Sequence, residues 1–137
     1  MKRGFTLIEV IMGLFLLGLV TVSVLPIANG AFYNLSKQKT RYNMIYTGEM
    51  VVERIKAFDC ETSKELFVYD VEIGQLIEEF RGNDYIEISL DKEGYDYPIK
   101  IIKENKSDSL WKIAVIVYNK DGGKSDSVEL KAYLPKK

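Results

Sequence analysis

The sequence predicts an α+β fold in which one long N-terminal helix packs its second half on a small antiparallel β-sheet. Two observations predict the helix. Residues 5–25 are apolar on every face apart from Glu9, and residues 32–58 carry apolar side chains at three- and four-residue spacing. A third observation predicts the sheet, because segments after position 85 alternate between polar and apolar side chains. An amphipathic helix beside such strands buries its apolar stripe against the sheet.

Residues 5–25 are long enough to cross a membrane as a helix, since they would extend about 31 Å. Lys2 and Arg3 precede this run, so the positive-inside tendency predicts a cytoplasmic N-terminus and an external C-terminal part. Glu9 is the residue that a plain anchor leaves unexplained, because an ionisable group in a membrane segment is costly and usually has a partner or a function. We assign residues 5–30 to this apolar half of the helix.

The second half of the helix, residues 31–60, is expected to be amphipathic. A kink or local melting is expected near Leu25, because Pro26 removes a backbone donor and crowds the preceding turn. The helix should then resume and end near Phe58. Its apolar stripe consists of Phe32, Leu35, Tyr42, Ile45, Gly48, Val52 and Ile55, widened by Met44, Val51 and Phe58. A single stripe indicates that the chain's own domain covers one side of this half.

Residues 61–137 are expected to form the outer domain, a small antiparallel sheet. We expect a short strand at 66–69, one or two helical turns at 71–80 and a turn at 81–84. Clearer strands are predicted at residues 85–90, 97–103, 110–118 and 127–134. The Asp-Gly-Gly sequence at 121–123 provides residues that tolerate positive φ, so the last two strands should pair as a hairpin.

Composition excludes several classes of function. The chain has 137 residues and a net charge of −1, which is enough for one modest domain beyond the helix and gives no strong nucleic-acid footprint. The absence of histidine removes Ser-His triads, the commonest zinc ligand and the commonest general base. Cys60 is the only cysteine, so no internal disulfide can form. We interpret Cys60 as a small apolar filler in preference to a reactive thiol or an intermolecular bridge.

One group of oxygen-bearing side chains is a weak candidate for a metal site. Asn119, Asp121 and Asp126 flank a glycine turn and could hold Ca²⁺. Their spacing does not fit an EF-hand loop, which needs ligands at alternating positions and a closing glutamate. A plain hairpin turn is the favoured interpretation, and we predict no metal and no cofactor.

Two further groups have both a functional and a structural interpretation. Tyr85, Tyr95 and Tyr97 could form an aromatic platform for a ligand, but tyrosine is also common on half-buried sheet faces. Glu78 and Glu79 could be a catalytic pair, but two adjacent acids are more often solvated. The sequence therefore predicts no enzyme.

The sequence Lys-Arg-Gly-Phe-Thr-Leu-Ile-Glu-Val at residues 2–10 resembles the processing signal of type IV prepilins and of the pseudopilins of type II secretion and DNA uptake. The resemblance implies a leader of residues 1–4 that is cut after Gly4, and N-methylation of the new terminal residue, Phe5. It implies that Glu9 pairs with the terminal amine of a neighbouring subunit. Pro26 stands where many pilin helices carry a kinking proline, whereas the single cysteine departs from pilins with a C-terminal disulfide.

The resemblance implies a structural subunit of a type IV pilus or related pseudopilus. Such a subunit is inserted in the cell membrane as a single-span precursor, processed by a prepilin peptidase, and moved from the bilayer into a surface filament by an assembly platform that adds it to other pilin or pseudopilin subunits. The short C-terminal hairpin also loosely resembles minor pilins and minor pseudopilins, which favours a minor subunit. Motility, adhesion, DNA uptake and secretion all remain open as the task of the filament.

Two other interpretations make the outer part a membrane-anchored or secreted domain that binds a ligand, for example an adhesin. The N-terminus could be a secretory signal peptide cut after Ala28-Asn29-Gly30, or a plain single-pass anchor. The apolar run is longer than the usual core of a signal peptide, and neither interpretation explains Gly4 or Glu9.

Overall fold

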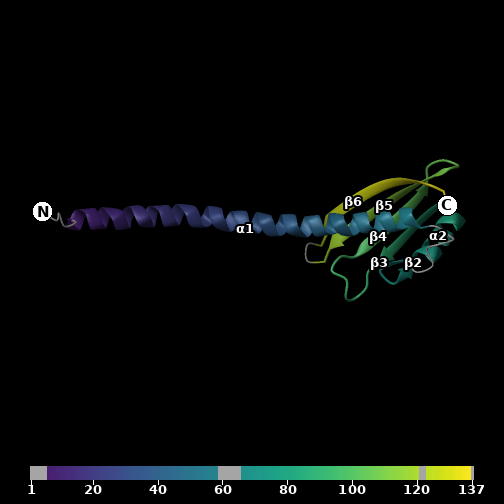
Figure 1. Ribbon diagram of the computed structural model, residues 1–137, viewed down its shortest axis with the longest axis horizontal. Coiled ribbons are helices and arrows are strands. Elements are labelled where there is room, and N and C mark those ends of the chain that lie inside the picture. Colours follow the sequence, from purple (N-terminus) through teal and green to yellow (C-terminus); the bar gives the residue numbers. More distant parts are fainter. Residues whose placement is uncertain (1–5, 59–65, 121–122, 137) are drawn as a thin grey trace. The chain divides into compact units, whose positions relative to one another are not determined.

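The structure is a computed structural model that describes residues 6–58, 66–120 and 123–136 (Figure 1). The chain divides into two compact units, Met1–Lys39 and Thr40–Lys137, and helix α1 contributes to both. The helices are α1 (Leu7–Ala57) and α2 (Ile73–Gly82). The strands are β1 (Phe67–Val68), β2 (Val71–Glu72), β3 (Tyr85–Leu90), β4 (Ile99–Asn105), β5 (Leu110–Asn119) and β6 (Gly123–Pro135). The predicted α+β class, a long N-terminal helix packed against a small antiparallel sheet, is confirmed.

Helix α1 continues through Pro26 without a break, so the expected local melting near Leu25 is wrong. Proline removes one backbone hydrogen bond, but the bonds of the turns on either side remain available and hold the helix together. Two nearby hydroxyl groups are also bonded within the helix. Thr21 Oγ1 donates to the Leu17 carbonyl at 2.8 Å, and Ser23 Oγ donates to the Leu19 carbonyl at 2.9 Å.

The main sheet has the strand order β3-β4-β5-β6, and every neighbouring pair is antiparallel. Ile101 in β4 lies opposite Ile88 on one side and Val115 on the other, so apolar residues share one face. The predicted hairpin of the last two strands is confirmed. Strand β4 starts later than predicted, at Ile99, because Pro98 has no N–H for the ladder and only its carbonyl pairs, with Tyr118 N at 2.9 Å.

Two predicted boundaries between β1 and β3 are wrong. Val71 and Glu72 form strand β2 and pair antiparallel with β1, so the helix predicted from position 71 begins at Ile73. At its other end α2 continues to Gly82, where a turn was expected. The Asn83 side chain explains this extension, because its amide donates to the Glu79 carbonyl at 3.0 Å and so supplies a bond that the last helical turn lacks.

The core of the second unit lies between α1, α2 and one face of the sheet. Of the predicted stripe on α1, Gly48, Val52 and Ile55 are buried, together with Met44 and Val51. Within the second unit Tyr42 is exposed, so the buried part of the stripe begins at Met44. Phe32 and Leu35 lie in the first unit and are exposed. The remaining core residues are Val68, Ile73, Leu76, Ile77, Phe80, Ile99, Ile101, Trp111, Ile113, Val115, Val117 and Leu134.

Lys103 is an exception to the apolar core, since its side chain is fully buried. It follows Ile99 and Ile101 on the inward face of β4. Its ammonium group donates to the Asn83 carbonyl at the end of α2 and lies 5.4 Å from the centre of the Trp111 ring. Burial lowers the pKa of Lys103, and the negative charge of nearby Asp84 offsets part of this shift.

Candidate functional site

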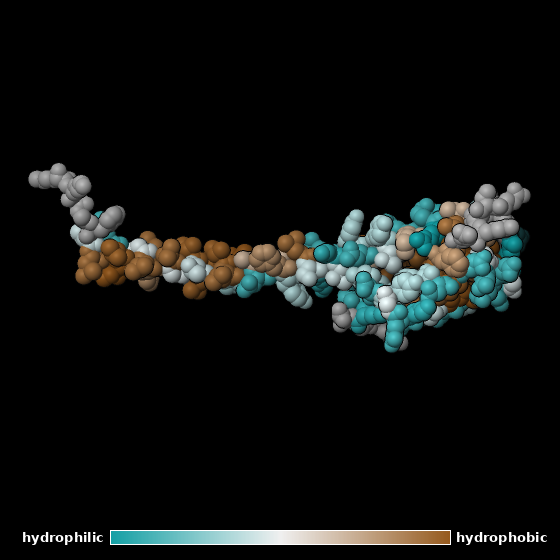
Figure 2. All heavy atoms as spheres, turned by 60° about the horizontal axis from the view of Figure 1, so that its bottom comes forward, coloured by the Kyte–Doolittle hydropathy of each residue, from teal (hydrophilic) through white to brown (hydrophobic). Residues whose placement is uncertain are grey.

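The first unit presents a continuous apolar surface. Every large apolar side chain between residues 7 and 35 is exposed. Apolar residues, coloured brown, follow one another along this part of the helix in Figure 2. An exposed apolar surface of this extent marks a site that contacts lipid or other protein. By length and composition α1 is the one helix among the described residues that could cross a membrane.

The start of α1 holds Glu9 in a local hydrogen-bond network. Glu9 Oε2 accepts bonds from the backbone nitrogen and from the hydroxyl of Thr6, both at 2.8 Å. In return the backbone nitrogen of Glu9 donates to the Thr6 carbonyl at 3.0 Å. Thr-x-x-Glu is the order of a capping box, in which the acid satisfies a donor that the first helical turn leaves free. This capping role was not predicted from the sequence, although Thr6 and Glu9 have the spacing that is typical of a capping box.

The network gives the Glu9 carboxylate partners within its own chain. It therefore reduces the cost of an acid at the start of an apolar helix, because a bonded carboxylate loses less on leaving water than an unbonded one. Lys2, Arg3, Gly4 and Phe5 of the predicted processing signal lie outside the described residues.

Of the weak metal candidates, Asn119 and Asp126 come together. The Asn119 side-chain amide donates to Asp126 Oδ2 at 2.8 Å across the β5–β6 hairpin. This bond occupies one of the carboxylate oxygens with a donor, which favours a hairpin contact over a cation site. Asp121 lies outside the described residues. Within the parts of the chain that the structure describes, no group of three His, Cys, Asp or Glu side chains could hold a metal ion.

The three tyrosines considered as an aromatic platform for a ligand do not lie together. Tyr95 and Tyr97 lie in the segment between β3 and β4 and line a common groove, whereas Tyr85 is exposed on the edge strand β3. Two tyrosines that the sequence analysis did not connect with them, Tyr46 and Tyr69, line the same groove.

The remaining candidates have no shared site. Glu78 and Glu79 are both exposed on α2, as expected of solvated acids. Cys60 lies outside the described residues.

Comparison with known proteins identifies the N-terminal segment. Residues 1–25 match the family model described as the prokaryotic N-terminal methylation motif. Searches of curated proteins and of solved structures gave no match. The matched segment contains the predicted cleavage position, the start of α1 and Glu9. The chain therefore carries at residues 1–25 the N-terminal methylation motif that is the signature of type IV pilins and pseudopilins.

Proposed function

We propose that this protein is a structural subunit, and specifically a minor subunit, of a type IV pilus or a related pseudopilus. The observation that carries the proposal is the methylation motif at residues 1–25 at the head of a helix whose large apolar side chains between residues 7 and 35 are all exposed. Its function is assembly into a filament, with no reaction of its own. The loose resemblance of its short C-terminal hairpin to minor pilins and minor pseudopilins supports the choice of a minor subunit.

The precursor is a single-span membrane protein. Lys2 and Arg3 keep the N-terminus in the cytoplasm, and the unit Thr40–Lys137 is outside. A prepilin peptidase cuts after Gly4, and methylation follows on the new terminal nitrogen of Phe5. A singly methylated amine keeps its positive charge, so processing removes the two leader cations and leaves one cation at the helix start.

Glu9 links processing to assembly. Before assembly Thr6 supplies its hydrogen bonds, and the helix start lies near the membrane interface. In the filament the apolar helices surround Glu9, where an unpaired carboxylate costs several kcal/mol. The terminal amine of Phe5 in a neighbouring subunit is the partner of opposite charge. Because that pair forms only at one axial stagger of the helices, Glu9 sets the register of the subunit.

The mature N-terminus tests the proposal. Mass spectrometry of the protein from its host should find N-methylated Phe5 at the N-terminus. An N-terminal Met1 would support a plain anchor, and Ala31 would support a secreted domain; either result contradicts the proposal. Gly4→Leu places a bulky side chain at the cleavage position and should leave the precursor uncut, with its leader in place. If Gly4→Leu has the same mature mass as wild type, cleavage after Gly4 is wrong.

A further inference from the structure

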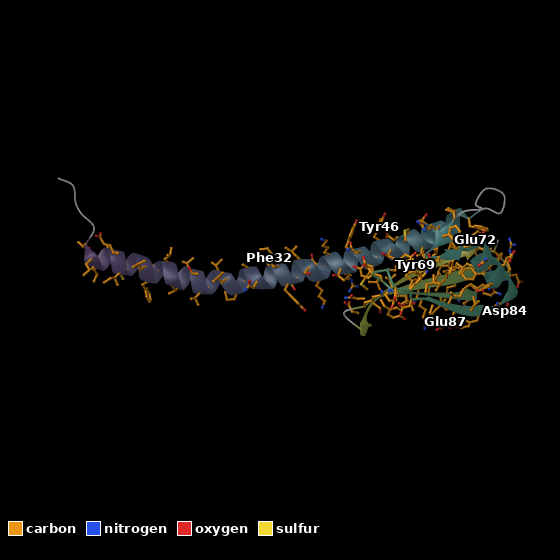
Figure 3. The ribbon with its side chains drawn as sticks, turned by 90° about the horizontal axis from the view of Figure 1, so that it is seen from below. Phe32, Tyr46, Tyr69, Glu72, Asp84 and Glu87 are labelled. Atoms are coloured by element: carbon orange, nitrogen blue, oxygen red, sulfur yellow. The ribbon has the colours of Figure 1, made fainter. Side chains whose placement is uncertain are left out.

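A groove in the second unit, which we call the tyrosine groove, lies between α1 and the segment that joins β3 to β4. Its volume is about 420 Å³, which is within the range of small-ligand sites. Tyr46 from α1, Tyr69 from the turn between β1 and β2, and Tyr95 and Tyr97 from the joining segment line it. Figure 3 labels Tyr46 and Tyr69, which come from these two separate elements. These tyrosines come from a helix, a turn and a joining segment, so a half-buried sheet face does not explain why they gather at one partly open site.

Tyr69 is held in a backbone conformation that a bulky side chain rarely adopts. Its φ is 54°, in the left-handed region that glycine or asparagine normally occupies. Its ring stacks on Tyr95, with ring centres 3.9 Å apart and planes 18° apart, and its hydroxyl donates to the Tyr97 carbonyl. Burial, together with Tyr95 and Asp96, raises the pKa of Tyr69 to about 12. Strained residues that neighbouring contacts hold in place concentrate at functional sites.

The segment between β3 and β4, which carries Tyr95 and Tyr97, is also anchored. Asp70 forms an ion pair with Lys92 and accepts a hydrogen bond from the Tyr95 hydroxyl at 3.3 Å through Oδ1. Lys120 donates to the Tyr95 carbonyl. These contacts join the segment between β3 and β4 to the β1–β2 turn and to Lys120, which follows β5 directly. A wall that is already ordered loses little entropy when a ligand binds.

The charges of the groove favour a neutral ligand. Among the described lining residues the charged side chains are Arg54 and Asp96, which are of opposite sign. Arg54 already donates to the Phe67 carbonyl, so its guanidinium is partly occupied. A phosphate or carboxylate ligand normally requires a surplus of positive charge, and single-stranded nucleic acid requires a basic track beside the aromatic rings. Neither is present among these residues.

We propose that the tyrosine groove binds a neutral saccharide. A sugar ring has an apolar C–H face that packs on a tyrosine ring, and hydroxyl groups at its rim that both donate and accept hydrogen bonds. The groove offers tyrosine rings for the first contact. For the sugar hydroxyl groups, the Asn43 amide can donate and accept hydrogen bonds, and the exposed Asp96 carboxylate can accept them. This role would give the outer face of the filament subunit a ligand, and it holds or fails independently of the filament itself.

Binding is measured on the full chain in detergent micelles. Maltohexaose, cellohexaose and the chitin hexamer are titrated by isothermal calorimetry and by saturation-transfer NMR. At least one should bind saturably. Tyr46→Ala should then weaken that binding about tenfold, which is typical of the loss of one well-stacked ring. Tyr42→Ala is the matched control, because Tyr42 is a similarly exposed tyrosine on the same helix and is not among the lining residues. This substitution should leave binding unchanged.

Asp96→Asn provides a second test that leaves the aromatic rings in place. It retains an acceptor but loses the negative charge, so it should weaken binding less than Tyr46→Ala does. Unchanged fluorescence of Trp111 confirms that each variant is folded, since Trp111 is buried in the same unit. Failure of all three sugars to bind, or equal effects of Tyr46→Ala and Tyr42→Ala, overturns the proposal. Binding of a thymidine oligonucleotide that weakens with salt, without sugar binding, overturns it in favour of nucleic acid.

Discussion

Gly48 marks the position where α1 approaches the sheet most closely among the described glycines. A Cβ atom at this position would overlap Leu130 Cδ1 and would lie 3.3 Å from Val117 Cγ2. Gly48→Ala therefore forces the Leu130 side chain to move and presses on Val117. The same substitution removes a residue that is unfavourable in a helix, so two opposite effects compete.

The structure indicates which effect is larger. Alanine in the interior of a helix is favoured over glycine by about 1 kcal/mol. Overpacking of a close contact costs about 1–3 kcal/mol. The flexible end of Leu130 can move and lowers this cost, whereas the tight contact with the branched Val117 side chain raises it, so we place the cost near the middle of that range. We expect Gly48→Ala to lower the free energy of unfolding by about 1 kcal/mol. In a Leu130→Ala background the overlap is gone, so the same change should raise it by up to about 1 kcal/mol.

Urea denaturation of the full chain in detergent micelles, followed by Trp111 fluorescence, measures the free energy of unfolding. It is applied to wild type, Gly48→Ala, Leu130→Ala and the double variant. Trp111 is the only tryptophan, and it is buried in the unit that contains Gly48. Gly74→Ala in α2 is the control, because its new Cβ would make only ordinary contacts, the nearest at 3.6 Å, and should not destabilise. If Gly48→Ala stabilises the protein in both backgrounds, the close approach of α1 to β6 is refuted.

Three further predictions concern other parts of the chain. Glu9→Ala and Glu9→Gln should leave membrane insertion and the melting of the outer domain intact while reducing the protein recovered in sheared filaments. Wild-type recovery of Glu9→Gln, which keeps an acceptor for Thr6 but has no charge, would mean either that the subunit lies at a filament tip or that the ion pair is absent, and crosslinking of Phe5 to a neighbouring helix would separate the two. The folded chain releases the Lys103 proton at a lower pH than the unfolded chain, because burial lowers the pKa of Lys103. The free energy of unfolding should therefore gain a contribution that rises with pH toward 10.5, and the difference in this free energy between wild type and Lys103→Met should show that slope. A flat difference means that the pKa is not lowered. A fragment that starts at Gly30 should be soluble, monomeric and cooperatively folded, since its core contains no residue before Met44. Gel filtration and near-ultraviolet circular dichroism measure this. An aggregated product would show that the core needs the apolar half of the helix.

Local patterns in the sequence were sufficient for the main elements of the fold. The apolar run after Gly4, the stripe that includes Val52 and Ile55, and the alternation in β3 and β6 each reflect a period of one helix or one strand. Such periods are set by backbone geometry and need no knowledge of distant residues. The processing motif is equally local, since it lies within residues 1–25. For these reasons the α+β class and the N-terminal methylation motif could be predicted from the residues alone.

The contacts that give the second unit its particular surface could not be predicted in this way. Lys103 bonds to a carbonyl 20 positions away, and Tyr69 bonds to one 28 positions away. The alternation of β4 places Lys103 on the inward face, but only the end of α2 supplies the acceptor that makes its burial tolerable. The tyrosine groove likewise exists because the turn at Tyr69 and the segment with Tyr97 meet in space. Periodicity assigns a residue to a face, whereas the neighbour that this face meets depends on how remote segments pack.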